Sequence, residues 1–175
     1  SLSVLNHLGR NLYRNFVTVL GEAISNSWDA DAENVWISID RENSSFSIKD
    51  DGRGMDNNDF QNKFLKIGYS KRKEGDRLSG KKRPFIGAKG IGKLALLSCA
   101  DRVSIFSKTE STGYTGGVID NSGLDQAIKS DMTAEEYPLE TLNYELIANL
   151  IDDHEKGTII YFEGTKEQLK NSDAF

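Results

Sequence analysis

The sequence has little cysteine, little proline and no long hydrophobic run. The single cysteine, Cys99, cannot form an internal disulfide bond, and it lies in the apolar run LALLSCA. We therefore expect Cys99 to be a small core residue of a protein in a reducing compartment, the cytoplasm. No stretch approaches the roughly 18 consecutive apolar residues of a membrane-spanning helix, and no signal peptide opens the chain. We expect no membrane partner.

An excess of basic charge is also missing. The chain holds 22 lysines and arginines against 27 acidic residues, a net charge of -5. A general nucleic-acid binder usually shows a basic excess, so contact with DNA is expected to come from other parts of a longer protein. The 175 residues, 37% of them hydrophobic, are enough for a single domain over residues 1–175 with its own core. We expect this domain to be a piece of a multidomain protein.

The most informative stretch is an amphipathic helix expected over residues 11–28. Its apolar residues recur at helical spacing, at Leu12, Phe16, Val19, Leu20 and Ala23, with Val17 and Ile24 widening the arc. Glu22, Asn26 and Asp29 follow at i, i+4 and i+7 and form one polar column beside that arc. A helix docked through the arc would hold the column at the rim of a cleft. The alternative is a solvated helix edge.

The rest of the chain alternates predicted strands with predicted helices. Alternating β-branched and aromatic residues predict strands over residues 34–40, 45–50, 102–108, 114–119 and 157–163. Further helices are expected over residues 2–9, 58–67, 91–99 and 165–171, with a mostly helical segment at 121–153. The separation of helices from antiparallel strands predicts an α+β fold, a two-layer sandwich.

Two glycine clusters could approach a phosphate. Gly52 and Gly54 follow a predicted strand, and GAKGIGK, residues 87–93, precedes a predicted helix. Glycines permit close backbone approach, and a helix N-terminus binds anions. The second cluster fits GxxxxGK, but Leu94 stands where a P-loop needs a Ser or Thr hydroxyl for Mg²⁺. Each cluster alone could be a tight turn.

Taken together, the motifs are more specific than any one of them. The chain contains Glu22-x-x-x-Asn26-x-x-Asp29-Ala30, Asp50-x-Gly52-x-Gly54, Gly87-x-x-Gly90-x-Gly92 and finally Gly157-Thr158 opening a late strand. This order resembles the GHKL ATPase superfamily of gyrase B, HSP90-type chaperones, histidine kinases, MutL and MORC proteins. The resemblance covers about residues 10–163. It implies a Bergerat-type fold, in which helices cover one face of a mixed, mostly antiparallel sheet.

The resemblance also implies roles for individual residues. Glu22 would be the general base that polarises the attacking water, and Asn26 would be the Mg²⁺ ligand. Asp50 would accept a hydrogen bond from the adenine amino group, assisted by Thr158. The neighbouring Asp51 occupies the variable position of the motif.

Other residues would complete an ATP site. Asp29 would support either the adenine-side network or the backbone, and Ala30 would belong to the binding site. Gly52 and Gly54 would let the backbone approach the nucleotide, and Met55 could pack on adenine or in the core. Residues 68–93 would form a mobile ATP lid. Its expected phosphate contacts are Ser70, Lys71, Gly87, Lys89, Gly90, Ile91, Gly92 and Lys93. The basic residues could equally belong to a solvated loop.

The resemblance predicts Mg²⁺-dependent ATP binding, with lid closure that drives formation of a homodimer in a larger machine. That machine would be chaperone-like or involved in DNA processing or defence, with DNA or a client protein as partner. Hydrolysis should be slow in this piece alone, because related ATPases receive a lysine from a following domain. One alternative is a nucleotide sensor without turnover. Another is a histidine-kinase-type phosphotransfer domain, although neither His7 nor His154 lies in a sequence resembling a phosphoacceptor box.

Overall fold

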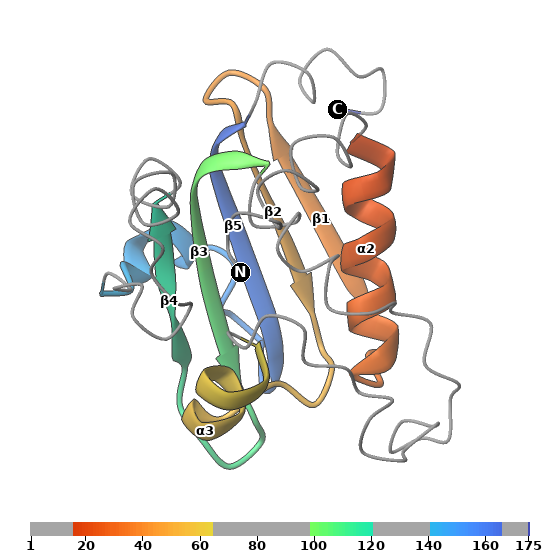
Figure 1. Ribbon diagram of the computed structural model, residues 1–175, viewed down its shortest axis with the longest axis vertical. Helices are drawn as coiled ribbons and strands as arrows, with labels where there is room; N and C mark the ends of the chain where they lie inside the picture. Colours follow the sequence, from red (N-terminus) through yellow and green to blue (C-terminus); the bar gives the residue numbers. More distant parts are fainter. Residues whose placement is uncertain (1–15, 65–98, 121–140, 166–174) are drawn as a thin grey trace, which may run out of the picture.

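A computed structural model describes residues 16–64, 99–120, 141–165 and 175. The helices expected over 2–9, 91–99 and 165–171 lie almost wholly outside these residues, as does the expected lid. The described part belongs to one α+β sandwich, which confirms the predicted fold class (Figure 1).

The sheet has five strands in the order β1-β2-β5-β3-β4, and all four pairings are antiparallel. No strand end differs from its predicted position by more than two residues. The strands are β1 (Val35–Asp40), β2 (Ser45–Asp50), β3 (Ala100–Lys108), β4 (Thr115–Asp120) and β5 (Gly157–Thr165). The long β5 lies between β2 and β3, so the strand that begins with the predicted Gly157-Thr158 motif is the centre of the sheet.

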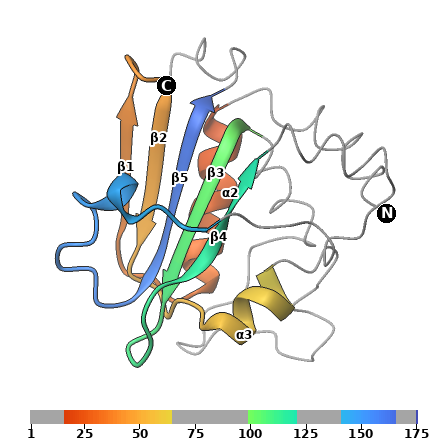
Figure 2. The ribbon, with the colours of Figure 1, turned by 90° about the vertical axis from the view of Figure 1, so that its left-hand side faces the viewer.

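Helix α2 (Phe16–Asp29) covers one face of the sheet (Figures 1 and 2). Phe16, Val19 and Ala23 are buried and pack in the main core. The Phe16 ring meets Phe46 of β2 edge-on at 5.0 Å, and Phe46 stacks on Phe162 of β5 at 4.2 Å. These aromatic contacts fix α2 over the sheet. Cys99 is buried in the same core, as predicted.

The apolar arc of α2 is narrower than the sequence suggested. Val17 and Ile24 were expected to widen it, but their side chains are 56% and 46% exposed. Both residues lie about 100° around the helix from the line of Phe16 and Ala23, which faces the sheet. A hydrophobic residue on the flank of a helix therefore does not have to reach the core.

The end of α2 is set by a left-handed residue. Asp31 has a φ of 60°, its N–H bonds to the carbonyl of Trp28, and the N–H of Ala32 bonds to the carbonyl of Ser27. This is the Schellman pattern that terminates helices, here with aspartate in the place that glycine usually takes. The turn sends the chain directly into β1.

The segment around residues 144–147 lies on the opposite face of the sheet from α2 (Figure 2), and a smaller apolar cluster forms there. Ile147, in the 3-10 turn η3 (Tyr144–Ile147), is buried there against Phe106 and Ile159. The prediction of a mostly helical segment is therefore wrong for residues 141–153, where η3 is the one helical element. The apolar side chains of this segment pack on the sheet through a 3-10 turn and following turns, which do not require a regular helix.

The short helix α3 (Asn57–Asp59) continues into a π-helical turn, η1 (Phe60–Phe64). The carboxylate of Asp56 caps it by accepting the N–H of Asp59 at 2.8 Å. Phe60 is fully buried in the main core, so a helix begins here as predicted, one residue early. Among the described residues, no helix has the length and apolar character needed to cross a membrane.

Two glycines should respond oppositely to substitution by alanine. Gly54 has a φ of +69°, and a Cβ there would overlap the carbonyl of Lys108. We expect Gly54→Ala to lower the free energy of unfolding by about 2–4 kcal/mol. Gly21 lies inside α2, and no atom of the described residues comes within 4 Å of a Cβ there, so Gly21→Ala should raise the free energy of unfolding by about 0.5–1 kcal/mol. Urea unfolding measures both, and equal effects would contradict the structural difference.

Candidate functional site

The carboxylate of Asp50 joins three of the predicted motifs. Its Oδ2 accepts a hydrogen bond from the Ser27 hydroxyl of α2 at 2.8 Å. Its Oδ1 accepts the N–H of Gly52 at 2.9 Å and the N–H of Thr158 at 3.2 Å. The helix, the glycine turn and the opening of β5 therefore meet at one side chain. Asp50 sits at the end of β2 and is 8% exposed.

Burial raises the pKa of Asp50, and the hydrogen bonds from Gly52, Ser27 and Thr158 act against that rise. A carboxylate has about four lone-pair positions, and donors from these residues occupy three of them. Counting donors from the described residues, one acceptor position is left on Oδ2. A ligand with an N–H donor, such as an amino group on a ring, could occupy it and further stabilise the ionised form.

The neighbouring Asp51 has a different task. Its Oδ1 accepts the N–H groups of Glu33 and Asn34, each at 2.8 Å, and its Oδ2 accepts the Asn34 side-chain amide. Burial raises the pKa of Asp51, but the hydrogen bonds from Asn34 and Glu33 outweigh it and hold the pKa below its usual value. Asp51 therefore anchors the backbone before β1 through all three of these hydrogen bonds.

The glycine turn packs closely against the end of α2. A Cβ on Gly52 would lie 2.9 Å from both the Cβ and the carbonyl oxygen of Ala30. The same Ala30 carbonyl accepts the N–H of Arg53 at 2.8 Å. Gly54, by contrast, is pressed against the end of β3 at Lys108. Two glycines predicted to approach a nucleotide are thus required, at least in part, by the packing of the turn itself.

The predicted polar column lies on α2 as expected. Glu22 and Asn26 are half-buried, whereas Asp29 is only 1% exposed. Burial raises the pKa of Glu22, which makes it a stronger base once ionised. Asn26 offers an amide oxygen, a donor type that Mg²⁺ accepts. No group of three or more His, Cys, Asp or Glu that could hold a metal occurs among the described residues, so a magnesium ion here would need phosphate and water ligands as well.

The opening of β5 is tied to the end of β3 by Ser107. Its hydroxyl lies 2.8 Å from the hydroxyl of Thr158, donates to the carbonyl of Gly157 at 3.2 Å and accepts the N–H of Met55 at 2.9 Å. Met55 is partly buried and packs against the main core. Ser107 therefore holds two predicted site residues, Thr158 and Met55, and the N–H of Thr158 also bonds to Asp50.

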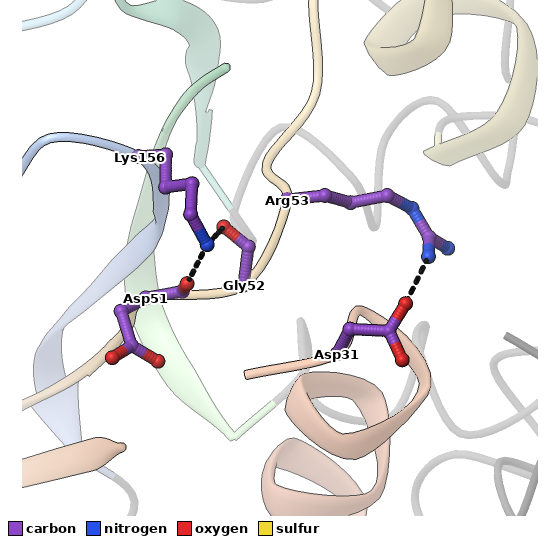
Figure 3. Close-up of polar contacts among 5 residues, drawn as sticks. All are labelled: Asp31, Asp51, Gly52, Arg53 and Lys156. Carbon is purple, nitrogen blue, oxygen red and sulfur yellow. Dashed lines mark hydrogen bonds and ion pairs between the residues drawn. The ribbon is translucent and has the colours of Figure 1, made fainter. Parts of the chain in front are cut away.

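Two side chains support the glycine turn through its carbonyls. The ammonium of Lys156 donates to the carbonyl of Asp51 at 2.6 Å and to that of Gly52 at 3.4 Å (Figure 3). The imidazole Nε2 of His154 lies 2.7 Å from the carbonyl oxygen of Asp50. On the side of α2, Arg53 forms an ion pair with Asp31 at 3.4 Å (Figure 3). The turn is thus held at both of its sides.

The predicted lid contacts lie outside the described residues: Ser70, Lys71, Gly87, Lys89, Gly90, Ile91, Gly92 and Lys93. Conversely, sequence reasoning missed Ser27, Ser107, His154 and Lys156, which hold the described part of the site. Ser27 carried one available signal, because it lies one helical turn from Ala23, among residues that face the sheet. His154 and Lys156 directly precede the Gly157-Thr158 motif.

Comparison with known proteins agrees with this geometry. The family described as histidine kinase-, DNA gyrase B- and HSP90-like ATPase matches residues 13–158, most of the chain. Over 177 residues the chain is also 34% identical to a protein of Herpetosiphon aurantiacus named putative type II restriction enzyme HgiDII. That match covers 99% of this chain but only 26% of the relative's length. The family match spans α2, the glycine turn and the start of β5, and the chain therefore belongs to the histidine kinase-, gyrase B- and HSP90-like ATPase family.

Proposed function

We propose that this domain binds ATP with Mg²⁺ and hydrolyses it slowly. The observation that carries the proposal is the buried carboxylate of Asp50, which joins α2, the glycine turn and β5 and keeps one acceptor position. An adenine amino group fits that position, because it supplies an N–H donor. Thr158, whose N–H already bonds to Asp50, would assist at the base.

The polar column of α2 supplies the chemistry at the phosphate end. Asn26 would hold Mg²⁺ through its amide oxygen, and the ion would neutralise phosphate charge. Glu22 would accept a proton from the attacking water. Burial raises the pKa of Glu22 toward the working pH, which favours a general base. This arrangement supports hydrolysis: the water oxygen would bond to the γ-phosphorus while its proton goes to Glu22, and the bond from that phosphorus to the oxygen of the β-phosphate would break, giving ADP and inorganic phosphate.

The context of the activity is also part of the proposal. The match to a putative restriction enzyme suggests a domain that couples nucleotide binding to DNA processing or defence in a longer protein. The net charge of -5 favours DNA contact through other parts of that protein. ATP binding would close the predicted lid over residues 68–93 and favour a homodimer.

Titration calorimetry of this chain with ATP, with and without Mg²⁺, tests the proposal. We expect one binding site per chain and an affinity that falls about 10-fold or more when Mg²⁺ is removed, because the phosphate charge then lacks its counter-ion. Light scattering of the same samples with a non-hydrolysable ATP analogue should show a mass above the 19.5 kDa monomer. Absence of heat with ATP and Mg²⁺ would overturn the binding claim, and an unchanged mass would overturn dimerisation of this domain.

A further inference from the structure

We propose that Tyr114, His154 and Lys156 are positioning residues that set the base specificity of the site by holding the backbone beneath Asp50. The inference rests on the proposed function, because it concerns how Asp50 recognises adenine. None of the three needs to touch the nucleotide. His154 and Lys156 contact the carbonyls of three consecutive residues, Asp50, Asp51 and Gly52, and Tyr114 acts through His154.

Asp50 pairs with Val35 of β1 but lies just past the part of β2 that pairs with β5. The pairing of β2 with β5 ends at Lys49 and Ile159, so β5 provides no partner strand residue for Asp50. Gly157 passes so close to the Asp50 carbonyl that a Cβ there would overlap it. The Nε2 of His154 supplies the missing donor at 2.7 Å. A side chain thus continues the hydrogen bonding of the sheet by one residue.

The chemistry of its neighbours fixes the protonation of His154. A carbonyl oxygen can only accept, so Nε2 carries the hydrogen. The side chain is 4% exposed, and burial lowers its pKa, which favours the neutral ring. Nδ1 is then an acceptor and takes the hydroxyl hydrogen of Tyr114 at 2.6 Å. Burial raises the pKa of Tyr114 to about 12, so that hydroxyl keeps its proton.

Two hydrogen bonds therefore connect Tyr114, the residue before β4, through the His154 ring to the carbonyl of Asp50. The Tyr114 and His154 rings also stack, with centroids 5.8 Å apart. Lys156 fixes the next two carbonyls, and the Lys49 ammonium lies 3.4 Å from the carbonyl of Asp152 in the same segment. With the backbone held at three successive residues, the Asp50 carboxylate keeps one orientation. A fixed acceptor is what discriminates between bases.

Two substitutions of His154 separate positioning from simple structural support. In His154→Gln the amide nitrogen falls near the place of Nε2 and can still donate to Asp50. In His154→Asn the amide falls near Nδ1, so the contact with Tyr114 can persist while the donor to Asp50 is lost. Both variants are tested by calorimetry with Mg-ADP and with Mg-IDP, whose base carries a carbonyl in place of the adenine amino group.

We expect the wild-type chain to prefer Mg-ADP over Mg-IDP by about 10-fold. His154→Asn should bind Mg-ADP about 5- to 10-fold more weakly, with Mg-IDP affinity changed by less than about 2-fold. His154→Gln should retain most of the preference. Equal losses for both nucleotides, or equal behaviour of the two variants, would overturn the positioning role.

Different experimental results would overturn the proposed function and this inference. A wild-type chain without binding, or without preference for Mg-ADP, overturns the role of Asp50 and the inference with it. A wild-type preference that His154→Asn retains overturns the inference alone. If His154→Asn does not fold, nitrogen NMR of the wild-type ring replaces it. The ring should be Nε2-protonated and its shifts should move with Mg-ADP more than with Mg-IDP, and equal or absent movement overturns the inference.

Discussion

Asp50→Asn is expected to weaken Mg-ATP binding by about 30- to 100-fold while the chain stays folded. In this variant an amide NH₂ group replaces the carboxylate oxygen that would accept the adenine amino group. Two hydrogen-bond donors would then face each other, and the negative charge is lost. The fold should survive, because the remaining amide oxygen can still accept the N–H groups of Gly52 and Thr158. The new NH₂ group can donate to the Ser27 hydroxyl, which also contacts the carbonyl of Ala23 at 3.1 Å. Calorimetry measures the affinity, and circular dichroism checks the fold.

Asp51→Asn is the matched control, because it makes the same chemical change one residue later. Among the described residues the Asp51 carboxylate accepts hydrogen bonds from Glu33 and Asn34 alone, so its substitution should cost about 1–2 kcal/mol of unfolding free energy and little nucleotide affinity. If Asp51→Asn lost affinity and Asp50→Asn kept it, the assignment of the adenine contact to Asp50 would be wrong.

The elements that could be read from the sequence are those with a local pattern. The strands alternate, α2 carries a 3.6-residue period, and the tight turn carries its glycines, so each could be placed to within a few residues. Val17 and Ile24 show the limit of that reading. A period says which residues share a flank of the helix, but only the position of the sheet decides which flank is covered.

The residues of the candidate site likewise fall into those that a local motif predicts and those that it does not. Asp50 and Thr158 could be proposed because they lie in motifs with fixed spacing. His154 and Ser107 could not, because their contacts join residues about 50 to 100 positions apart in the chain, to Gly157 and to Asp50. A histidine with both ring nitrogens bonded inside the protein has the same appearance in a sequence as a free one. The helix predicted over residues 141–153 was wrong because the pattern is ambiguous. Apolar residues at spacings of three or four suit a 3-10 turn packed on a sheet as well as an α-helix.

Glu22→Gln should leave Mg-ATP affinity within about 3-fold of wild type but lower the rate of hydrolysis by about 100-fold or more. Glutamine keeps the shape of the side chain and cannot accept the proton of the attacking water. The burial that raises the pKa of Glu22 also favours an uncharged side chain at this position, so the variant should fold at least as well. Single-turnover assays with enzyme in excess over labelled ATP can detect even slow hydrolysis.

Glu110→Gln provides the control, since Glu110 is an exposed residue in the turn before β4 and the charge change is identical. It should hydrolyse ATP as the wild type does. A chain that binds ATP without turnover, and is unaffected by Glu22→Gln, would be a nucleotide sensor. Label that stays on the protein would indicate phosphotransfer, and His154 would be a poor acceptor because it is buried with both ring nitrogens engaged. Release of inorganic phosphate that is lost in Glu22→Gln is the result that establishes an ATPase. It would show that the polar column of α2 takes part in the reaction as well as in nucleotide binding.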